Sequence, residues 1–110
     1  MATYDDFTKL DLCVGKITST EPIVGKSKIF KGIVDIGDEE RTVIIGGAEF
    51  LSPEDMINRT VIVVTNLEPK TIGGVTSTAM LLAADVNDRP YWLTISDDSI
   101  PFVPLGSPIK

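Results

Sequence analysis

The feature that most constrains the fold is the run TVIVVT at residues 60–65. β-Branched side chains pack well on a pleated sheet and lose rotamer freedom in a helix, so they favour strands. A short apolar run of this length, without polar alternation, is typical of a strand buried on both faces. We therefore predict a central strand here, and a fold of the all-β class.

Four other segments have the alternation of apolar and other residues that a half-buried strand requires. In the first of these segments, Gly15 and Lys16 interrupt the alternation, which predicts a β-bulge there. The polar turn at residues 37–40 separates the second and third segments, which predicts a hairpin. The predicted strands lie at residues 10–17, 30–36, 42–45 and 75–84.

A short helix is predicted between the third and fourth strands. Ser52 can cap free N–H groups, Pro53 suits the first helical position, and the following acids suit the positive end of the helix dipole. We expect about two turns, ending at Asn58 or Arg59. Five strands with one helix in this position predict an OB-fold, a five-stranded Greek-key barrel. The 110 residues form a single domain in this prediction, with the barrel at about 7–86 and a C-terminal extension at about 87–110.

Composition excludes several kinds of chemistry. The chain has no histidine and one cysteine, which removes His-dependent nucleophiles and Cys- or His-based zinc sites. Residues 85–89 lack the Gly and Glu that close an EF-hand loop, so we expect no metal and no cofactor. No apolar run approaches the roughly 20 residues that span a bilayer, and the acidic N-terminus does not resemble a secretion signal. We expect a cytoplasmic protein with no membrane partner.

The charge is unevenly distributed. The net charge is −6, whereas a nucleic-acid binder normally presents a basic surface. Residues 7–34 nevertheless contain five basic residues and two acidic ones. On an OB-fold the second and third strands and the neighbouring loops bind nucleic acid. This predicts a basic nucleic-acid surface, although solvated strand lysines that prevent edge aggregation would give the same pattern. The basic residues at these positions are Lys26, Lys28, Lys31 and Arg41.

Two longer motifs indicate a family. Residues 66–84 read NLEPKTIGGVTSTAMLLAA and residues 4–17 read YDDFTKLDLCVGKI. They resemble the tRNA-binding domain that is appended to some methionyl- and tyrosyl-tRNA synthetases and is also found alone in dimeric tRNA-binding and secretion-chaperone-like proteins. In that family the first motif runs N-L-x-P, G-V, S-x-(G/A)-M and then a small-residue strand. Cys13 replaces the usual Arg of the second motif, and Glu68 replaces a Lys.

The resemblance implies further binding residues, namely Asn66, Lys70, Ser77 and Met80. A hydroxyl can donate to a phosphate or ribose oxygen, an amide can donate and accept, and Met offers a soft apolar surface to a base. The alternative is structural, with Met80 in the core, Ser77 relieving crowding and Asn66 closing a turn. Phe30 and Phe50 are candidate stacking platforms or core residues.

The C-terminal extension contains apolar surface that a five-stranded barrel does not need. The resemblance implies that this segment takes part in a two-fold dimer; the alternative is that it folds back over one end of its own barrel. The residues assigned to the dimer interface are Tyr91, Trp92, Leu93, Phe102 and Pro104.

The leading functional hypothesis is a non-catalytic protein that recognises the shape of tRNA, as an auxiliary to an aminoacyl-tRNA synthetase. The alternative is an export-chaperone-like module that binds a peptide or protein on the same fold, which the acidic net charge and the missing basic loop residues favour. An enzyme is disfavoured, because the paired carboxylates fall in predicted turns and at a helix start, and no phosphate-binding Gly-rich loop is present.

Overall fold

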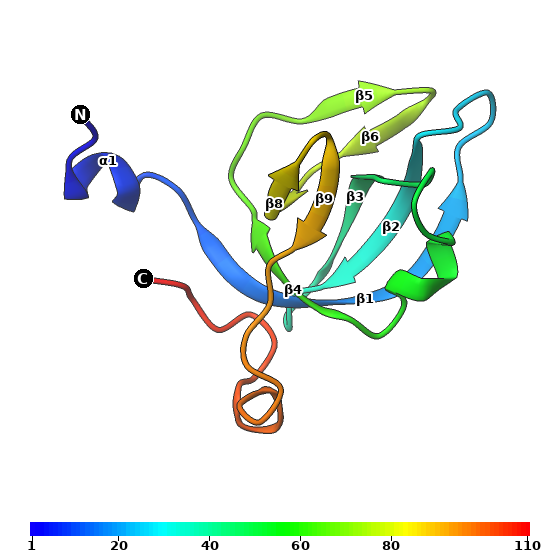
Figure 1. Cartoon of the computed structure of the whole chain (residues 1–110). Coiled ribbons are helices and arrows are strands. Elements are labelled where there is room, and N and C mark those ends of the chain that lie inside the picture. The colour runs from blue at the N-terminus through cyan, green and yellow to red at the C-terminus, as the bar shows by residue number, and fades with distance from the viewer.

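The computed structural model describes all 110 residues (Figure 1). Strands dominate, and no helix is long and apolar enough to cross a membrane. The helical elements are α1 (Tyr4–Thr8) and the 3₁₀ turns η1 (Pro53–Met56) and η2 (Ile100–Phe102). The strands are β1 (Leu12–Pro22), β2 (Ile29–Asp35), β3 (Glu40–Gly46), β4 (Thr60–Val64), β5 (Lys70–Ile72), β6 (Val75–Ser77), β7 (Met80–Leu81), β8 (Ala83–Val86) and β9 (Arg89–Trp92).

Five strands form the barrel, in the order β3-β2-β1-β4-β7. Neighbouring strands in this order are antiparallel. A parallel bridge between Val43 and Ala79 joins β3 to the residue before β7 and brings the two edges of the sheet together. This order, with the third and fifth strands meeting in parallel, is that of the OB-fold. The all-β prediction and the OB-fold prediction are confirmed.

The core follows the alternation of the strands. Phe30 and Val34 on β2 are buried, with Gly32 between them where a Cβ would lie 2.6 Å from Ile45. Met56 of η1 is fully buried, so this turn fills the barrel from one side. Ten buried residues make the main cluster: Ile17, Phe30, Val34, Ile36, Val43, Ile45, Met56, Val61, Val63 and Ala79.

The N-terminal segment differs from the prediction, because the first strand begins at Leu12 and a short helix precedes it. Thr3 accepts a hydrogen bond from the Asp6 amide at 3.1 Å, and the Asp6 carboxylate accepts one from the Thr3 amide at 2.9 Å. This is a complete capping box. None of the helix residues is buried, and α1 projects away from the barrel (Figure 1).

The bulge prediction at Gly15-Lys16 was wrong in position. The register of β1 against β2 shifts between Ile17 and Ser19. Gly15 serves packing instead, since a Cβ there would lie 2.7 Å from Val34 and 2.9 Å from Val63. The strand changes its main partner near Lys16, which pairs with both β2 and β4.

The helix before β4 is present but shorter than predicted. It is one 3₁₀ turn with Pro53 at its start, and the Ser52 side chain makes no capping hydrogen bond. Asn58 has a φ of 72°, and its amide donates to Ile17 O at 2.7 Å. The helical path ends at Ile57, whose backbone is extended, and the left-handed Asn58 then bonds the chain to β1.

The predicted fifth strand, residues 75–84, is divided into β6, β7 and β8. β6 pairs with β5 to form a hairpin, β7 pairs with β4, and β8 pairs with β9. At the first break the Thr78 amide donates to Thr42 O at 3.0 Å, which turns the chain toward β3. One predicted strand therefore contributes to three sheets.

The C-terminal end returns to the barrel. The Val14 amide donates to Ser107 O at 3.0 Å, and the Ile109 amide donates to Leu12 O at 2.9 Å. A Cβ at Gly106 would lie 2.3 Å from Ile36 O, and one at Gly37 would lie 2.4 Å from Leu105 O. The two glycines therefore allow the backbones to meet, and the tail pairs with β1 beyond the reach of β2.

Candidate nucleic-acid interface

Two loops that are far apart in the sequence lie together at one edge of the barrel. One is the β1–β2 loop, residues 23–28, and the other is the β5–β6 hairpin, whose tip is Gly73-Gly74. Both glycines have positive φ, 58° and 79°, as the tight turn requires. A Cβ at Gly73 would lie 2.7 Å from Ile23 and 3.6 Å from Lys26 Cε. The hairpin tip thus rests against the β1–β2 loop.

A groove of about 260 Å³ lies beneath this hairpin. Three residues predicted from the family motif, Lys70, Ser77 and Met80, line it together. Lys70 and Ser77 are direct cross-strand partners in the hairpin, and Met80 is 44% exposed. We call this hollow the hairpin groove. Its other lining residues are Ile44, Leu67, Glu68, Ile72 and Ala79.

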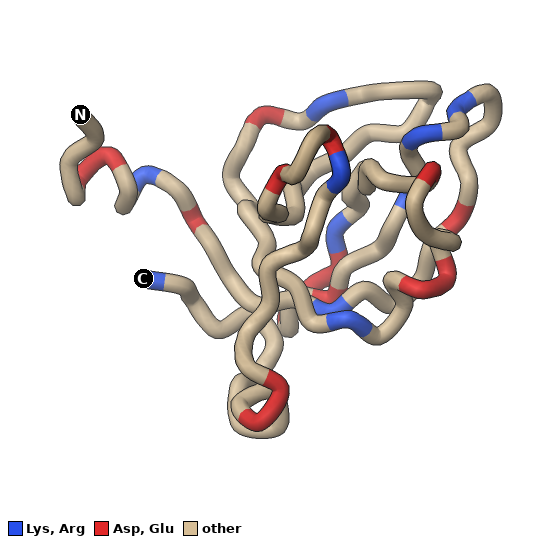
Figure 2. The backbone as a smooth tube through the Cα atoms, in the orientation of Figure 1, with Lys and Arg blue, Asp and Glu red and all other residues tan.

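The predicted basic residues are distributed around this groove rather than all within it. Figure 2 shows basic positions in the β1–β2 loop and at the start of β5, along the same edge of the molecule. Lys26 and Lys28 are exposed in that loop. Lys31 is paired in register with Ile44, one strand away from the groove, and its ammonium forms an ion pair with Glu21 at 3.2 Å. The structure therefore brings Lys26, Lys28 and Lys70 to one edge, with Lys31 beside it.

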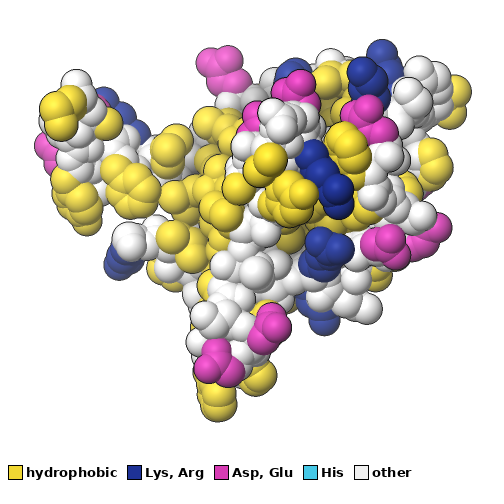
Figure 3. Space-filling model, in the orientation of Figure 1, with side chains coloured by type: hydrophobic (Ala, Val, Ile, Leu, Met, Phe, Trp, Pro, Cys, Tyr) yellow, Lys and Arg dark blue, Asp and Glu magenta, His cyan; other side chains and the backbone are white.

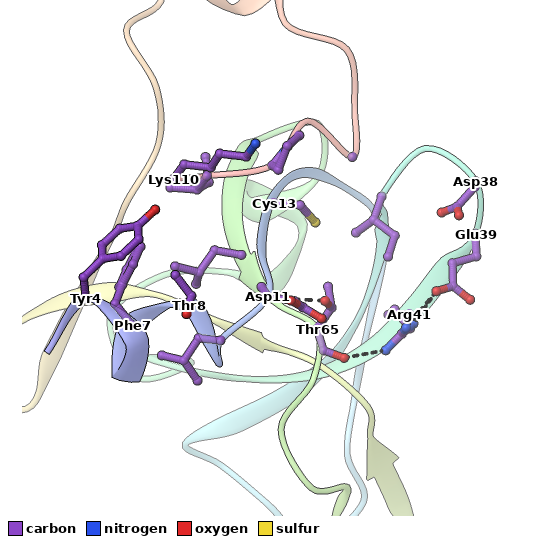
Figure 4. Close-up of a pocket in the computed structure, with 16 residues that line it drawn as sticks. Tyr4, Phe7, Thr8, Asp11, Cys13, Asp38, Glu39, Arg41, Thr65 and Lys110 are labelled. Atoms are coloured by element: carbon purple, nitrogen blue, oxygen red, sulfur yellow. Dashed lines mark hydrogen bonds and ion pairs between the residues drawn. The ribbon is translucent and has the colours of Figure 1, made fainter. Parts of the chain in front are cut away.

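Arg41 lies elsewhere, at the end of the barrel (Figure 4). Its Nη1 donates to Thr65 O at 3.1 Å and to Thr78 O at 2.9 Å, and its Nε and Nη2 donate to Glu39 at 2.9 and 2.7 Å. All three nitrogens are therefore used inside the protein. The side chain connects β3 to the end of β4 and to the segment before β7.

Asn66 and Ser77 also make internal hydrogen bonds. The side chain of Asn66 accepts a hydrogen bond from Asp11 N through its Oδ1 at 2.8 Å. Its Nδ2 donates to Lys9 O at 2.7 Å, so the side chain holds the segment between α1 and β1 in place. The Ser77 hydroxyl donates to Ala79 O at 2.6 Å. Its lone pairs remain available as acceptors, and it lines the hairpin groove.

The residues predicted for a dimer interface differ in exposure. Phe102 is 83% exposed, and Tyr91, Leu93 and Pro104 are exposed as well. Trp92 is half-buried and packs against the core. Its ring and that of Pro90 cover Gly47, where a Cβ would lie 3.1 and 2.9 Å from them.

A second hollow, of about 470 Å³, opens at the end of the barrel between α1 and the C-terminal tail (Figure 4). Tyr4, Phe7 and Ile109 line it together with Asp38 and Glu39. Cys13, at the position where the resembling family carries Arg, also faces it. Burial raises the pKa of the Cys13 thiol, and the positive charge of Arg41 opposes this only in part. The thiol is therefore protonated, and a poor nucleophile, at neutral pH.

The fold and the groove together define a small OB-fold protein with a basic edge beside a partly apolar groove. A family model described as "Putative tRNA binding domain" matches residues 12–103. The chain belongs to this tRNA-binding domain family, and the predicted family is confirmed.

Similar proteins include methionine–tRNA ligases, which are much longer than this chain, and solved structures of proteins of about its own length. Methionine–tRNA ligases of Methanothrix thermoacetophila and Methanocella arvoryzae are 49% and 45% identical to this chain over 97% and 90% of its length. The chain spans only 15% and 14% of those ligases. The crystal structure of a MetRS-related protein from Pyrococcus horikoshii is 34% identical to this chain, matches 100% of this chain and 98% of its own length, and has a TM-score of 0.88. A CsaA chaperone structure from Picrophilus torridus is 26% identical, covers 100% of both chains and has a TM-score of 0.86.

Proposed function

We propose that this chain is a non-catalytic protein that binds tRNA by its shape, as an auxiliary to an aminoacyl-tRNA synthetase in the cytoplasm. The observation that carries the proposal is the convergence of Lys70, Ser77 and Met80 on one groove, with Lys26 beside the tip of the hairpin that covers it. Membership of the tRNA-binding domain family and the identity to methionine–tRNA ligases support RNA as the ligand.

The groove favours backbone and base-surface contacts over sequence reading. Lys70 and Lys26 can neutralise phosphates, the Ser77 hydroxyl oxygen can accept from a ribose hydroxyl, and Met80 can contact the face of a base. Groups of this kind track a sugar–phosphate backbone, and in folded RNA they recognise shape. Glu68 is the only acidic residue in the groove lining. A single carboxylate without a second acid fits a binding role.

The second candidate is a peptide-binding module on the same groove. The apolar side chains of Ile44, Leu67 and Ile72 line it, and the negative charge of Glu68 would repel a phosphate group. The net charge of −6 also weakens attraction to RNA at a distance. Structural similarity to CsaA chaperones is compatible with this function.

One experiment separates these two functions. Filter binding of bulk tRNA to the whole chain, measured from about 50 to 200 mM salt, is expected to show affinity that falls steeply with salt, because each phosphate contact releases counterions. The same protein is then tested for retention of a chemically unfolded polypeptide. Indifference to tRNA at all salt concentrations, combined with salt-insensitive retention of the polypeptide, would replace the RNA function with the peptide function.

We also propose a two-fold dimer. α1 buries none of its residues within the chain, and it exposes Tyr4 and Phe7, which suits a helix that packs on a second copy. The exposed Leu93, Phe102 and Pro104 are the predicted contribution of the C-terminal extension. A dimer would present two hairpin grooves to one RNA and so raise the apparent affinity.

The dimer predicts a mass near twice 11.9 kDa in light scattering after gel filtration. Phe7→Ser and Phe102→Ser, made separately, are expected to weaken the association at least 10-fold by removing buried aromatic surface. Val24→Ser, which removes an exposed apolar side chain from the β1–β2 loop, is the control and should leave the mass unchanged. A monomeric wild-type chain at millimolar concentration would contradict the dimer.

A further inference from the structure

A third hollow on the surface, of about 300 Å³, is formed by the segments before and after η1 and by β9. It contains two arginines and no acidic residue, although the chain as a whole has 16 acids against 10 basic residues. Each of the four other sizeable hollows contains at least one carboxylate. We call it the arginine hollow. Its lining residues are Phe50, Leu51, Arg59, Arg89, Pro90, Tyr91 and Trp92.

Two aromatic rings hold the Arg89 guanidinium in the hollow by packing against it. The guanidinium carbon lies 5.3 Å from the centre of the Phe50 ring and 5.1 Å from that of Tyr91. Both distances are within the range of cation–π interactions, which restrict a guanidinium without using its N–H groups. The three ion pairs of the chain involve Lys9, Lys31 and Arg41, and no side-chain hydrogen bond involves Arg89. Its donors are therefore free.

Arg59 is fixed by a different contact. Its Nε donates to Asp55 O at 3.0 Å, at the end of η1, and this leaves both terminal nitrogens without a partner. Figure 3 shows two groups of basic side chains close together beside β9, next to hydrophobic side chains. Two guanidinium groups that are held in place and have unused donors form a site for an anion with several oxygens.

We propose that the arginine hollow binds a phosphate of the RNA backbone, as a contact separate from the hairpin groove. This inference rests on the proposed function, because it takes the RNA bound at the groove to continue over β9. A phosphate diester offers oxygens that match the fork of a guanidinium, and phosphate contacts set the position of an RNA without reading its sequence. The residues of the hollow lie outside both family motifs described above.

The first test is the salt dependence of tRNA binding by the whole chain. Arg89→Gln and Arg59→Gln are each expected to reduce the slope of log affinity against log salt by about one, and the double variant by about two. Lys110→Gln removes the same charge at the C-terminus and should leave the slope unchanged. Arg89→Lys keeps the charge but loses the planar fork, so its slope should stay near the wild-type value while its affinity falls several-fold.

The second test needs no RNA. Titration with inorganic phosphate, followed by the NMR signals of the arginine Nε–H groups, is expected to shift Arg89 and Arg59 together and saturably. Arg41, whose donors are already bonded to Thr65, Thr78 and Glu39, serves as the internal reference. Arg89 and Arg59 signals that move no more than the Arg41 signal would overturn the anion site.

The outcomes separate this inference from the proposed function. Wild-type slope in Arg89→Gln and Arg59→Gln, with tRNA still bound, would overturn the arginine hollow and leave the hairpin groove standing. Failure of the wild-type chain to bind tRNA would overturn both the arginine hollow and the proposed function. A response of Arg89 to a peptide carboxylate but not to RNA would overturn the RNA assignment in favour of a peptide ligand. Light scattering of each variant shows whether the change acts through the predicted dimer surface at Tyr91.

Discussion

Replacing Phe30 with alanine is expected to lower the free energy of unfolding by about 3–5 kcal/mol. Phe30 is 1% exposed and pairs with Ile45 on β3 within the main buried cluster. Truncation removes the transfer free energy of the ring and leaves a cavity that the surrounding strands cannot close, because hydrogen bonds hold both sides of β2. Urea unfolding followed by fluorescence or circular dichroism gives the value.

The matched control for this prediction is the same substitution on the surface. Phe102 is 83% exposed, so Phe102→Ala should change the free energy of unfolding of the monomer by less than about 0.5 kcal/mol. Equal losses in the two variants would mean that Phe30 does not lie in the core. The result also decides between the two roles considered for Phe30, since a stacking platform at the surface would affect RNA affinity without this loss of stability.

The double variant Lys26→Gln, Lys70→Gln is expected to weaken tRNA binding about 10- to 100-fold at about 0.1 M salt and to reduce the salt slope by about two. Lys26 lies where the β1–β2 loop meets the tip of the β5–β6 hairpin, and Lys70 lies in the groove at the other end of β5. Neither forms an ion pair within the chain, so their removal should not destabilise the fold. Filter binding at several salt concentrations provides both quantities.

The control for this pair is Lys9→Gln, Lys110→Gln, which makes the same change in net charge. These residues lie in α1's C-terminal cap and at the end of the tail, away from the hairpin groove. If RNA responds only to the total charge of the protein, the two double variants will lose affinity equally, and the groove will have no special role. A larger loss in the Lys26 and Lys70 variant is the outcome that the groove predicts.

The strands that form the barrel could be predicted because their pattern is local. Phe30, Gly32 and Val34 fall on alternate positions, and the same residues face the core in the structure. The same alternation indicates that the Arg41 side chain points inward, away from a nucleic-acid surface. Arg41 is two residues before Val43 and therefore shares its face, at the position where β3 leaves the barrel interior.

Other features depend on partners that are distant in the sequence. The side chain of Asn66 forms hydrogen bonds with Asp11 and Lys9, which are 55 and 57 positions earlier in the sequence. No local pattern indicates such long-range hydrogen bonds. The division of the predicted fifth strand follows from three different partners, β5, β4 and β9, that compete for one apolar segment. The capping box of α1 is a local feature, because Thr3 and Asp6 have the required spacing in the sequence. The arginine hollow joins the segments on either side of η1 to β9, so its two arginines, Arg59 and Arg89, are 30 residues apart in the sequence.

The central claim is that the hairpin groove is the surface that meets tRNA. Its most direct test is NMR mapping of backbone amide signals during titration of the whole chain with tRNA. The account predicts that the largest changes fall in the β1–β2 loop, in β5 and β6, and at Met80, and that they weaken as salt is raised. Changes confined to α1 and the C-terminal tail, or no change at low salt, would contradict it.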